Sequence, residues 1–208
     1  MNRISPEAPV PILEVEQEWE KLGLAANISH NLKMLGMTST LCGVAGDDGK
    51  ASHLERLLEE IGLKTWGIVR DKERPTTFKE RIITSSQQIC RIDYENKTKI
   101  STNVENLILK RFKDFINDHN AVIIEDYAKG LLTENLLQEI ILICKNKKIM
   151  VTLDPGRNTN PMPYKGVDLL KPNFSEAKKM TQNLGLSKEA SVEAVSYTHL
   201  TLPTICSV

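Results

Sequence analysis

Apolar and polar positions follow a regular pattern along the second half of the chain. Short apolar runs alternate with stretches whose apolar residues recur at helical spacing. The pattern predicts, in order, a helix over residues 103–117, a strand over 121–125, a helix capped by Thr133 that runs to Cys144, a strand over 148–153 and a strand over 167–170. Strands and helices in this alternation indicate parallel βαβ units with helices on the faces of a sheet.

The first half of the chain predicts two more helix–strand pairs. In order, they are a helix over 25–35, a strand over 38–44, a helix over 51–61 and a strand over 66–69. Gly36 and Gly62 follow the two helices directly, where glycine often ends a helix. Residues 3–14 contain three prolines, which favours an extended segment at the edge of a sheet over a central strand.

Residues 76–95 have a different pattern, typical of a small antiparallel sheet. Two strands, 76–84 and 88–95, are predicted around a polar turn at Ser85 and Ser86. Polar and apolar residues alternate along the second strand, which suggests one packed face and one wet face. The polar face could line a ligand cleft or simply be solvated, and the residues leave both interpretations open.

The stretch from Leu170 to Glu176 joins the last predicted strand to a helix. We expect Ser175 to cap that helix, so that Asn173 and Glu176 lie beside its N-terminus. Open α/β sheets bind ligands at the carboxyl ends of their strands, and helix N-termini favour phosphate. An amide and a carboxylate there could order waters around Mg²⁺. Taken alone, these residues fit a plain strand-to-helix turn at least as well.

Three successive strands deliver polar residues to the same edge of the predicted sheet. Asp126 and Lys129 follow the first strand, Asp154 follows the second, and the Asn173–Glu176 stretch follows the third. A phosphate-and-metal site needs carboxylates near the metal and a lysine near the phosphoryl oxygens. The convergence therefore predicts such a site more strongly than any single motif.

Composition narrows the classes of function. The 208 residues carry 27 Lys and Arg against 27 Asp and Glu, so no basic excess points to nucleic acid or an anionic membrane. No apolar run is long enough for a membrane span, and the first residues lack a signal-peptide core.

Classical nucleophile, P-loop and zinc signatures are missing from the sequence. It contains neither a Gly-x-Ser-x-Gly elbow nor a P-loop. The four cysteines and four histidines are scattered, which argues against zinc, and three cysteines next to apolar runs are predicted to be buried thiols.

Several blocks of the sequence, in order, resemble the ribokinase-like (PfkB) carbohydrate kinases, and most closely the branch that phosphorylates heptose 7-phosphate. The blocks are Arg3-Ile-Ser-Pro-Glu-Ala-Pro-Val-Pro11, Gly23-Leu-Ala-Ala-Asn27, Arg74-Pro-Thr-Thr-Phe-Lys79 with Gln87–Asp93, Asp126-Tyr-Ala-Lys-Gly130, Leu153-Asp-Pro155 and Lys171-Pro-Asn-Phe-Ser-Glu176. The resemblance covers about residues 2–194. It implies an α/β fold with a Rossmann-type parallel sheet flanked by helices and a small β lid, formed by strands at about 4–14 and 76–95.

The resemblance also implies a reaction. It is ATP-dependent and Mg²⁺-dependent phosphorylation of the anomeric hydroxyl of D-glycero-D-manno-heptose 7-phosphate, giving the 1,7-bisphosphate used to make ADP-heptose for lipopolysaccharide. A cytoplasmic location and a homodimer through the lid strands are implied as well. Another sugar or sugar phosphate is the alternative substrate.

Site residues follow from matching motif positions. The resemblance assigns nucleotide binding to Asn173, Phe174, Ser175 and Glu176, with Glu176 reaching the metal through water. It assigns the sugar or its phosphate to Gly23, Asn27, Lys79, Arg91, Asp126, Lys129 and Asp154.

The sequence departs from the family pattern in three ways. Leu24 stands where the family has a second glycine, which puts the shape of the sugar pocket in question. The family's first strand, with its sugar-binding aspartate, and its Gly-Ala-Gly-Asp anion hole, with the catalytic base, have no counterpart. Residues 196–208 match no family pattern and are interpreted as a non-native tail. We therefore expect residues 1–195 to form a partial, incomplete kinase domain that is inactive by itself, or a non-catalytic module that binds nucleotide or sugar phosphate.

Overall fold

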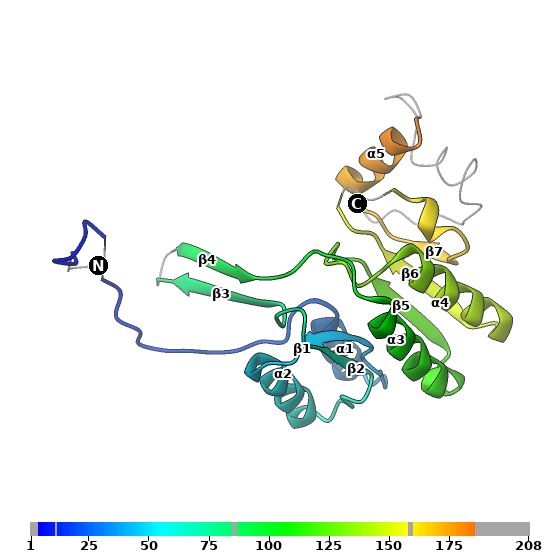
Figure 1. Cartoon of the computed structure of the whole chain (residues 1–208), viewed down its shortest axis with the longest axis horizontal. Helices are drawn as coiled ribbons and strands as arrows, with labels where there is room; N and C mark the ends of the chain where they lie inside the picture. Colours follow the sequence, from blue (N-terminus) through cyan, green and yellow to red (C-terminus); the bar gives the residue numbers. More distant parts are fainter. Residues whose placement is uncertain (1–3, 11, 85–86, 158–159, 186–208) are drawn as a thin grey trace.

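The computed structural model describes residues 4–10, 12–84, 87–157 and 160–185, and its described part is an α/β fold (Figure 1). Its elements are, in chain order, α1 (Leu24–Met34), β1 (Gly43–Gly46), α2 (Gly49–Glu60), β2 (Ile68–Asp71), β3 (Phe78–Ile83), β4 (Gln88–Tyr94), α3 (Thr102–Phe115), the 3-10 helix η1 (Ile116–Asp118), β5 (Ala121–Glu125), α4 (Glu134–Lys147), β6 (Met150–Asp154), the 3-10 helix η2 (Met162–Tyr164), β7 (Leu169–Leu170) and α5 (Phe174–Asn183). None of these helices is long and apolar enough to span a membrane.

The second half forms the parallel βαβ units predicted from the sequence. Strands β5, β6 and β7 pair in parallel in that order, and α4 connects the first two. The Thr133 hydroxyl caps α4, as predicted, by accepting a hydrogen bond from the backbone N–H of Leu136 at 3.1 Å. Local sequence signals therefore set the individual strands and helices, and parallel pairing joins the strands into a sheet.

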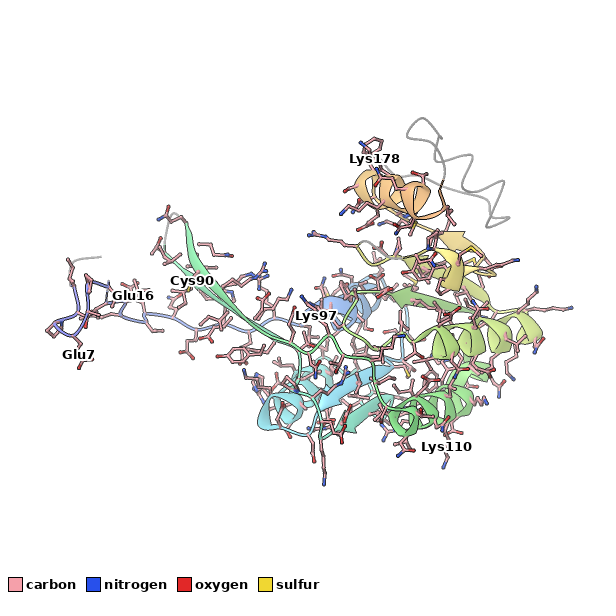
Figure 2. All side chains as sticks on the ribbon, turned by 45° about the horizontal axis from the view of Figure 1, so that its top comes forward. Glu7, Glu16, Cys90, Lys97, Lys110 and Lys178 are labelled. Atoms are coloured by element: carbon pink, nitrogen blue, oxygen red, sulfur yellow. The ribbon has the colours of Figure 1, made fainter. Side chains whose placement is uncertain are left out.

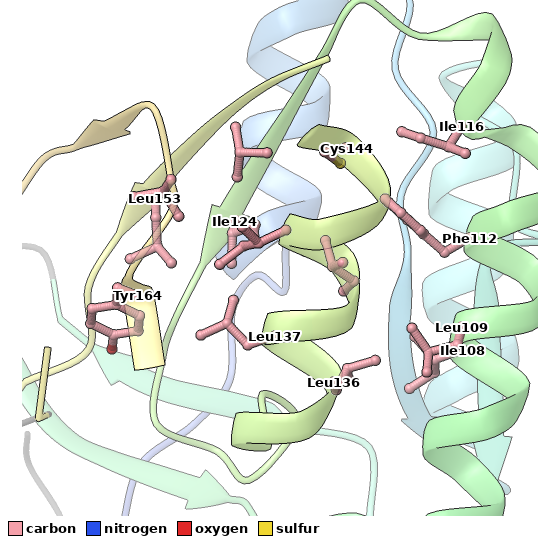
Figure 3. Close-up of a cluster of buried hydrophobic side chains, with 14 of the residues drawn as sticks. Ile108, Leu109, Phe112, Ile116, Ile124, Leu136, Leu137, Cys144, Leu153 and Tyr164 are labelled. Atoms are coloured by element: carbon pink, nitrogen blue, oxygen red, sulfur yellow. The ribbon is translucent and has the colours of Figure 1, made fainter. Parts of the chain in front are cut away.

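The main core lies between this sheet and the helices α3 and α4 (Figure 3). From α4, Leu136 and Cys144 are fully buried, and Leu153 of β6 is 1% exposed. Ile108 and Phe112 of α3 pack into the same cluster. Burying a side chain of this size contributes about 1.5–3 kcal/mol each. This shared core fixes α3 and α4 against one face of the sheet.

The first half contributes a smaller parallel pair, β1 and β2, with its own apolar cluster around Ala51 and Leu58 of α2. Arg111 of α3 ties this pair to the second half, because its guanidinium donates to the backbone oxygens of Trp66 (3.0 Å) and Ile68. The predicted strand over 38–44 is shorter and later than expected. Within residues 38–42, only Thr40 forms an isolated bridge, with Lys64, and β1 begins at Gly43.

The hairpin β3–β4 projects from the body of the molecule (Figure 1). Its antiparallel pairing confirms the two strands predicted over 76–95. The expectation of one packed face is wrong, since every residue of β4 except Ile89 is exposed. The physical reason is that no layer of the described chain covers either face of the hairpin. The apolar residues that alternate with polar ones along β4 therefore stay exposed. Cys90 is accordingly exposed, whereas Cys144 is buried and Cys42 is half-buried.

The expected lid strand at about 4–14 is also absent among the described residues of that segment. Residues 4–10 form a short loop in which the backbone N–H of Ser5 donates to the oxygen of Val10 at 2.9 Å, and residues 12–23 form no strand. Proline lacks the backbone N–H that a ladder needs, and Pro6 and Pro9 interrupt any continuous pairing. The predicted tail at 196–208 lies outside the described residues.

A buried carboxylate links α3 to α4 and generates a stability prediction. Glu105 is 6% exposed, and it accepts hydrogen bonds from the Thr133 hydroxyl (2.6 Å) and from the Asn135 amide. Glu105→Ala would leave these donors without their acceptor, so we expect the free energy of unfolding to fall by about 1–3 kcal/mol in urea denaturation. Glu73→Ala, at an exposed glutamate, is the control. Equal stability of the two variants would contradict the role of Glu105.

Candidate functional site

The carboxyl ends of β5, β6 and β7 meet at one edge, as the sequence predicted. In the parallel register Glu125 lies opposite Asp154, and Leu153 lies opposite Leu170. Beyond the strands, the backbone N–H of Asp126 donates to the oxygen of Asp154 at 3.0 Å, and that of Lys171 to the oxygen of Leu153 at 2.9 Å. The three strand-to-loop turns are thereby held next to one another.

Both carboxylate oxygens of Asp126 accept hydrogen bonds from other groups of the protein. One carboxylate oxygen accepts from the backbone N–H of Ala128 at 2.7 Å, and the other accepts from the Tyr164 hydroxyl at 2.7 Å. Ala128 has φ +53°, a conformation that the first of these bonds supports. The Asp126 carboxylate therefore shapes the loop after β5 and anchors η2 to it.

Asp154 lies in a small cluster of charged groups. The Lys171 ammonium is 3.6 Å from its carboxylate, and both side chains are more than a third exposed. Burial, and then the negative charge of Asp154, raise the pKa of Glu125, while a hydrogen bond with Tyr127 and the charge of Lys171 lower it. Burial and the Glu125 carboxylate raise the pKa of Tyr127 to about 12. The edge thus crowds two carboxylates beside one lysine.

Glu125, Tyr127 and Lys171 were missed as site residues by the sequence analysis. The sequence did contain a signal for two of them. Glu125 ends an apolar strand and Lys171 directly follows one, and polar residues at strand ends were the reason for selecting Asp126 and Asn173. Burial of the Glu125 carboxyl, in contrast, depends on the neighbouring strand and cannot be read from spacing.

The N-terminus of α5 corrects one prediction. Asn173, and not Ser175, is the N-cap: its side-chain oxygen accepts from the backbone N–H of Glu176 at 3.0 Å, and the Glu176 carboxylate accepts from the backbone N–H of Asn173 at 2.9 Å. The spacing of a cap residue and a glutamate three positions later makes this reciprocal capping box. Ser175 is inside the helix and exposed, and Phe174 is 79% exposed.

Lys129 pairs with a carboxylate at the outgoing end of the β3–β4 hairpin. Its ammonium donates to Glu95, directly after β4, and the two side chains are 20% and 15% exposed. The hydrogen bond from Lys129 is the main cause that lowers the pKa of Glu95 in the fold, although burial opposes it. The loop after β5 is therefore fastened to the outgoing end of the hairpin.

Close backbone packing reinforces this junction. Gly130 has φ +77°, and a Cβ there would lie 1.9 Å from the backbone oxygen of Thr98. The guanidinium of Arg74, whose side chain is 8% exposed, donates to that same oxygen at 2.8 Å and to the oxygen of Lys129 at 3.4 Å. Its Nε lies 3.2 Å from the Asp71 carboxylate without hydrogen-bond alignment. Only glycine fits at position 130.

The two predicted lid cations differ in their surroundings. Arg91 forms a bidentate pair with Asp93, at 2.8 and 3.0 Å. Lys79 lies opposite Asp93 in the β3–β4 register. Both therefore sit beside the same carboxylate on the hairpin, while the edge residues belong to the body.

Gly23 and Asn27 lie at the start of α1. Gly23 is the N-cap residue, and a Cβ on it would meet no atom within 4 Å. The Asn27 side chain is exposed. The neighbouring Leu24 has φ +53°, a left-handed conformation that glycine adopts readily and leucine does not. The backbone thus keeps a glycine-like path at the position where the family glycine is replaced.

The raised pKa of Glu125 gives a pH prediction. A carboxyl whose pKa is higher in the folded state destabilises the fold once the pH rises above its unfolded value, and not below it. We therefore expect Glu125→Gln to increase the free energy of unfolding at about pH 7 and to have little effect at about pH 4. In an Asp154→Asn background the increase should be smaller, because one cause of the shift is gone. A pH-independent effect would contradict this account.

Solved structures share the fold of this chain. A PfkB protein from Polaromonas sp. JS666 superposes with a TM-score of 0.64 over 96% of this chain and 71% of its own, at 13% identity. A ribokinase from Arabidopsis thaliana, solved with ribose and ATP, gives 0.60 over 86% and 58%, at 18% identity. These likenesses establish the ribokinase-like fold.

Similarity of sequence is higher among curated proteins. Bifunctional protein HldE from Wolinella succinogenes is 41% identical over 193 residues, which are 92% of this chain and 40% of that protein. Bifunctional protein HldE from Helicobacter hepaticus is 36% identical over 207 residues, which are 100% and 42%. The chain spans less than half the length of these relatives. The sequence pattern described as "pfkB family carbohydrate kinase" matches residues 4–202, and the chain belongs to that family.

Proposed function

We propose that this chain is part of an ATP-dependent sugar kinase that phosphorylates the anomeric hydroxyl of D-glycero-D-manno-heptose 7-phosphate. The product is the 1,7-bisphosphate, a precursor of ADP-heptose and lipopolysaccharide, made in the cytoplasm. Two lines support this assignment: the ordered heptose-kinase blocks of the sequence, and relatives named HldE at 36–41% identity across almost the whole chain. A kinase of the same family for another sugar phosphate is the alternative.

The observation that carries the proposal is the shared edge of β5, β6 and β7. It brings Glu125, Asp154 and Lys171 next to the N-terminus of α5. Helix N-termini and lysines attract phosphate, whereas carboxylates attract Mg²⁺. One edge therefore offers both charges that a metal–nucleotide complex requires.

The residues at this edge fit ATP with Mg²⁺. Mg²⁺ takes oxygen ligands, keeps several waters and needs few carboxylates. Among the described residues, no group of three or more His, Cys, Asp or Glu is arranged to hold a metal ion. We assign nucleotide binding to Asn173, Phe174, Ser175 and Glu176, with Glu176 acting on the metal through water. Bound Mg²⁺ would neutralise developing phosphoryl charge.

The sugar phosphate would lie between the body and the lid. We assign its hydroxyls to Gly23 and Asn27 and its phosphate to Lys79, Arg91 and Lys129, with Asp126 and Asp154 lining the site. Lys129 and Arg91 are paired with carboxylates of the hairpin, and those pairs keep the cations positioned. An arriving phosphate would share or replace these carboxylate partners.

The hairpin is also the surface that we assign to homodimer contact in the whole protein. Ile92 is 40% exposed and Ile83 is 45% exposed, on the part of the hairpin beyond its contact with Lys50 of α2. Apolar side chains gathered on an uncovered hairpin are typical of an interface.

The first prediction concerns turnover. The sequence contains no Gly-Ala-Gly-Asp segment, so it lacks the family's catalytic base and backbone donors for the transferred phosphoryl group. We expect the purified 208-residue chain to release no ADP above background from ATP and heptose 7-phosphate in a coupled assay. Turnover comparable to that of a full-length kinase would contradict the expected inactivity of this chain, but not the kinase assignment. Binding without turnover is the result expected of a binding module as well.

The second prediction separates the two roles of Glu176. Glutamine can replace glutamate in a capping box, so Glu176→Gln should keep α5 and the thermal midpoint unchanged. It removes the charge that we assign to the metal. In calorimetric titrations, Mg²⁺ should tighten ATP binding to the unaltered chain and to the control Glu134→Gln, at another helix start, and less so to Glu176→Gln. An equal response to Mg²⁺ in all three proteins would refute the role of Glu176.

A further inference from the structure

The incoming end of the hairpin is fastened to the N-terminus of α2. Asp48 is the N-cap of that helix, and its carboxylate accepts from the backbone N–H of Ala51 at 2.9 Å. The same carboxylate accepts from Thr76, just before β3, through the hydroxyl at 2.7 Å and the backbone N–H at 2.8 Å. One helix end thus serves both its own cap and the root of the lid.

Two residues further along the helix, Lys50 makes a second contact with the hairpin. Its ammonium lies 3.3 Å from the ring centroid of Tyr94 and 4.2 Å from that of Phe78. These rings belong to residues that face each other in the β3–β4 register, and their centroids are 5.9 Å apart. A cation this close to two aromatic faces is attracted by both ring quadrupoles. The contact spans both strands at the base of the lid.

The stability of α2 does not explain why a lysine stands at position 50. The positive end of the helix dipole disfavours a lysine in the first turn, where acidic residues are preferred. The first turn of α2 contains no acidic residue. Lys50 is half-buried and is directed to the two rings. Its favourable interactions are with the lid, and with the neighbouring Asp48 charge.

We propose that Lys50 is a positioning residue that fixes the angle at which the β3–β4 hairpin leaves the body of the molecule. The hairpin extends freely beyond its base (Figures 1 and 2), so contacts at the base determine its direction. Asp48 and Thr76 hold one strand, whereas Lys50 acts on both strands at once. Under the proposed kinase function the angle would set how Lys79 and Arg91 approach a sugar phosphate. The anchor itself does not depend on that function.

Hydrogen exchange of the 208-residue chain tests the proposal. In Lys50→Met, which keeps length and removes charge, amides of 78–83 and 88–94 should exchange about two- to five-fold faster, the factor expected for one partly exposed cation–π contact. Amides of β5 and β6 should be unchanged. Lys50→Arg keeps a cation over the rings and should restore the rates of the unaltered chain. Lys110→Met, on α3 and away from the hairpin (Figure 2), is the matched control.

A second substitution makes the test independent of any general loss of stability. Tyr94→Leu should speed exchange in the same amides, and adding Lys50→Met to it should have a smaller effect than Lys50→Met alone, because only Phe78 remains as a ring partner. Unchanged hairpin exchange in Lys50→Met would overturn the proposal. So would faster exchange that extends to β5 and β6, or effects of the two substitutions that simply add.

Discussion

Parallel pairing of β5, β6 and β7 is the constraint on which the rest of the structure depends. Parallel strands all end at one edge, and two backbone hydrogen bonds continue the register past the strand ends into the loops, at Asp126 and Lys171. That geometry brings Glu125 opposite Asp154 whether or not their charges are compatible. The neighbouring carboxylates at this edge therefore follow from the topology of the sheet.

Most polar groups around this edge already have protein partners. Asn173 and Glu176 satisfy each other's backbone, Asp126 holds Tyr164, and Lys129 holds Glu95. Such pairing keeps side chains in one rotamer, so a ligand meets fixed charges and loses less ordering entropy on binding. It also means that the same residues contribute to stability, which is why substitutions that keep the hydrogen bond and remove the charge are informative.

Features that depend on residues close together in the sequence could be predicted, whereas contacts between distant segments could not. The strands 121–125 and 76–95 and the Thr133 cap depend on neighbours within a few residues, and those predictions are confirmed. The correct cap of α5 was also readable, since Asn173 stands three positions before Glu176. The pairing of Lys129 with Glu95, 34 residues away, was not readable from spacing. Nor was the exposure of the hairpin, because alternation does not reveal whether a covering layer exists.

Leu24 shows how firmly the backbone at the start of α1 is held. A leucine in the left-handed region costs about 1–2 kcal/mol, and the chain could avoid that cost by taking another path at this turn. It does not, although a Cβ at the preceding Gly23 would meet nothing and that neighbour imposes no steric limit. On the helix side of the turn, Ala26 of α1 is buried in the apolar cluster of the first half and anchors the start of the helix. A leucine at this position therefore lowers the stability of the loop, because the turn keeps a left-handed conformation at residue 24 despite the Cβ.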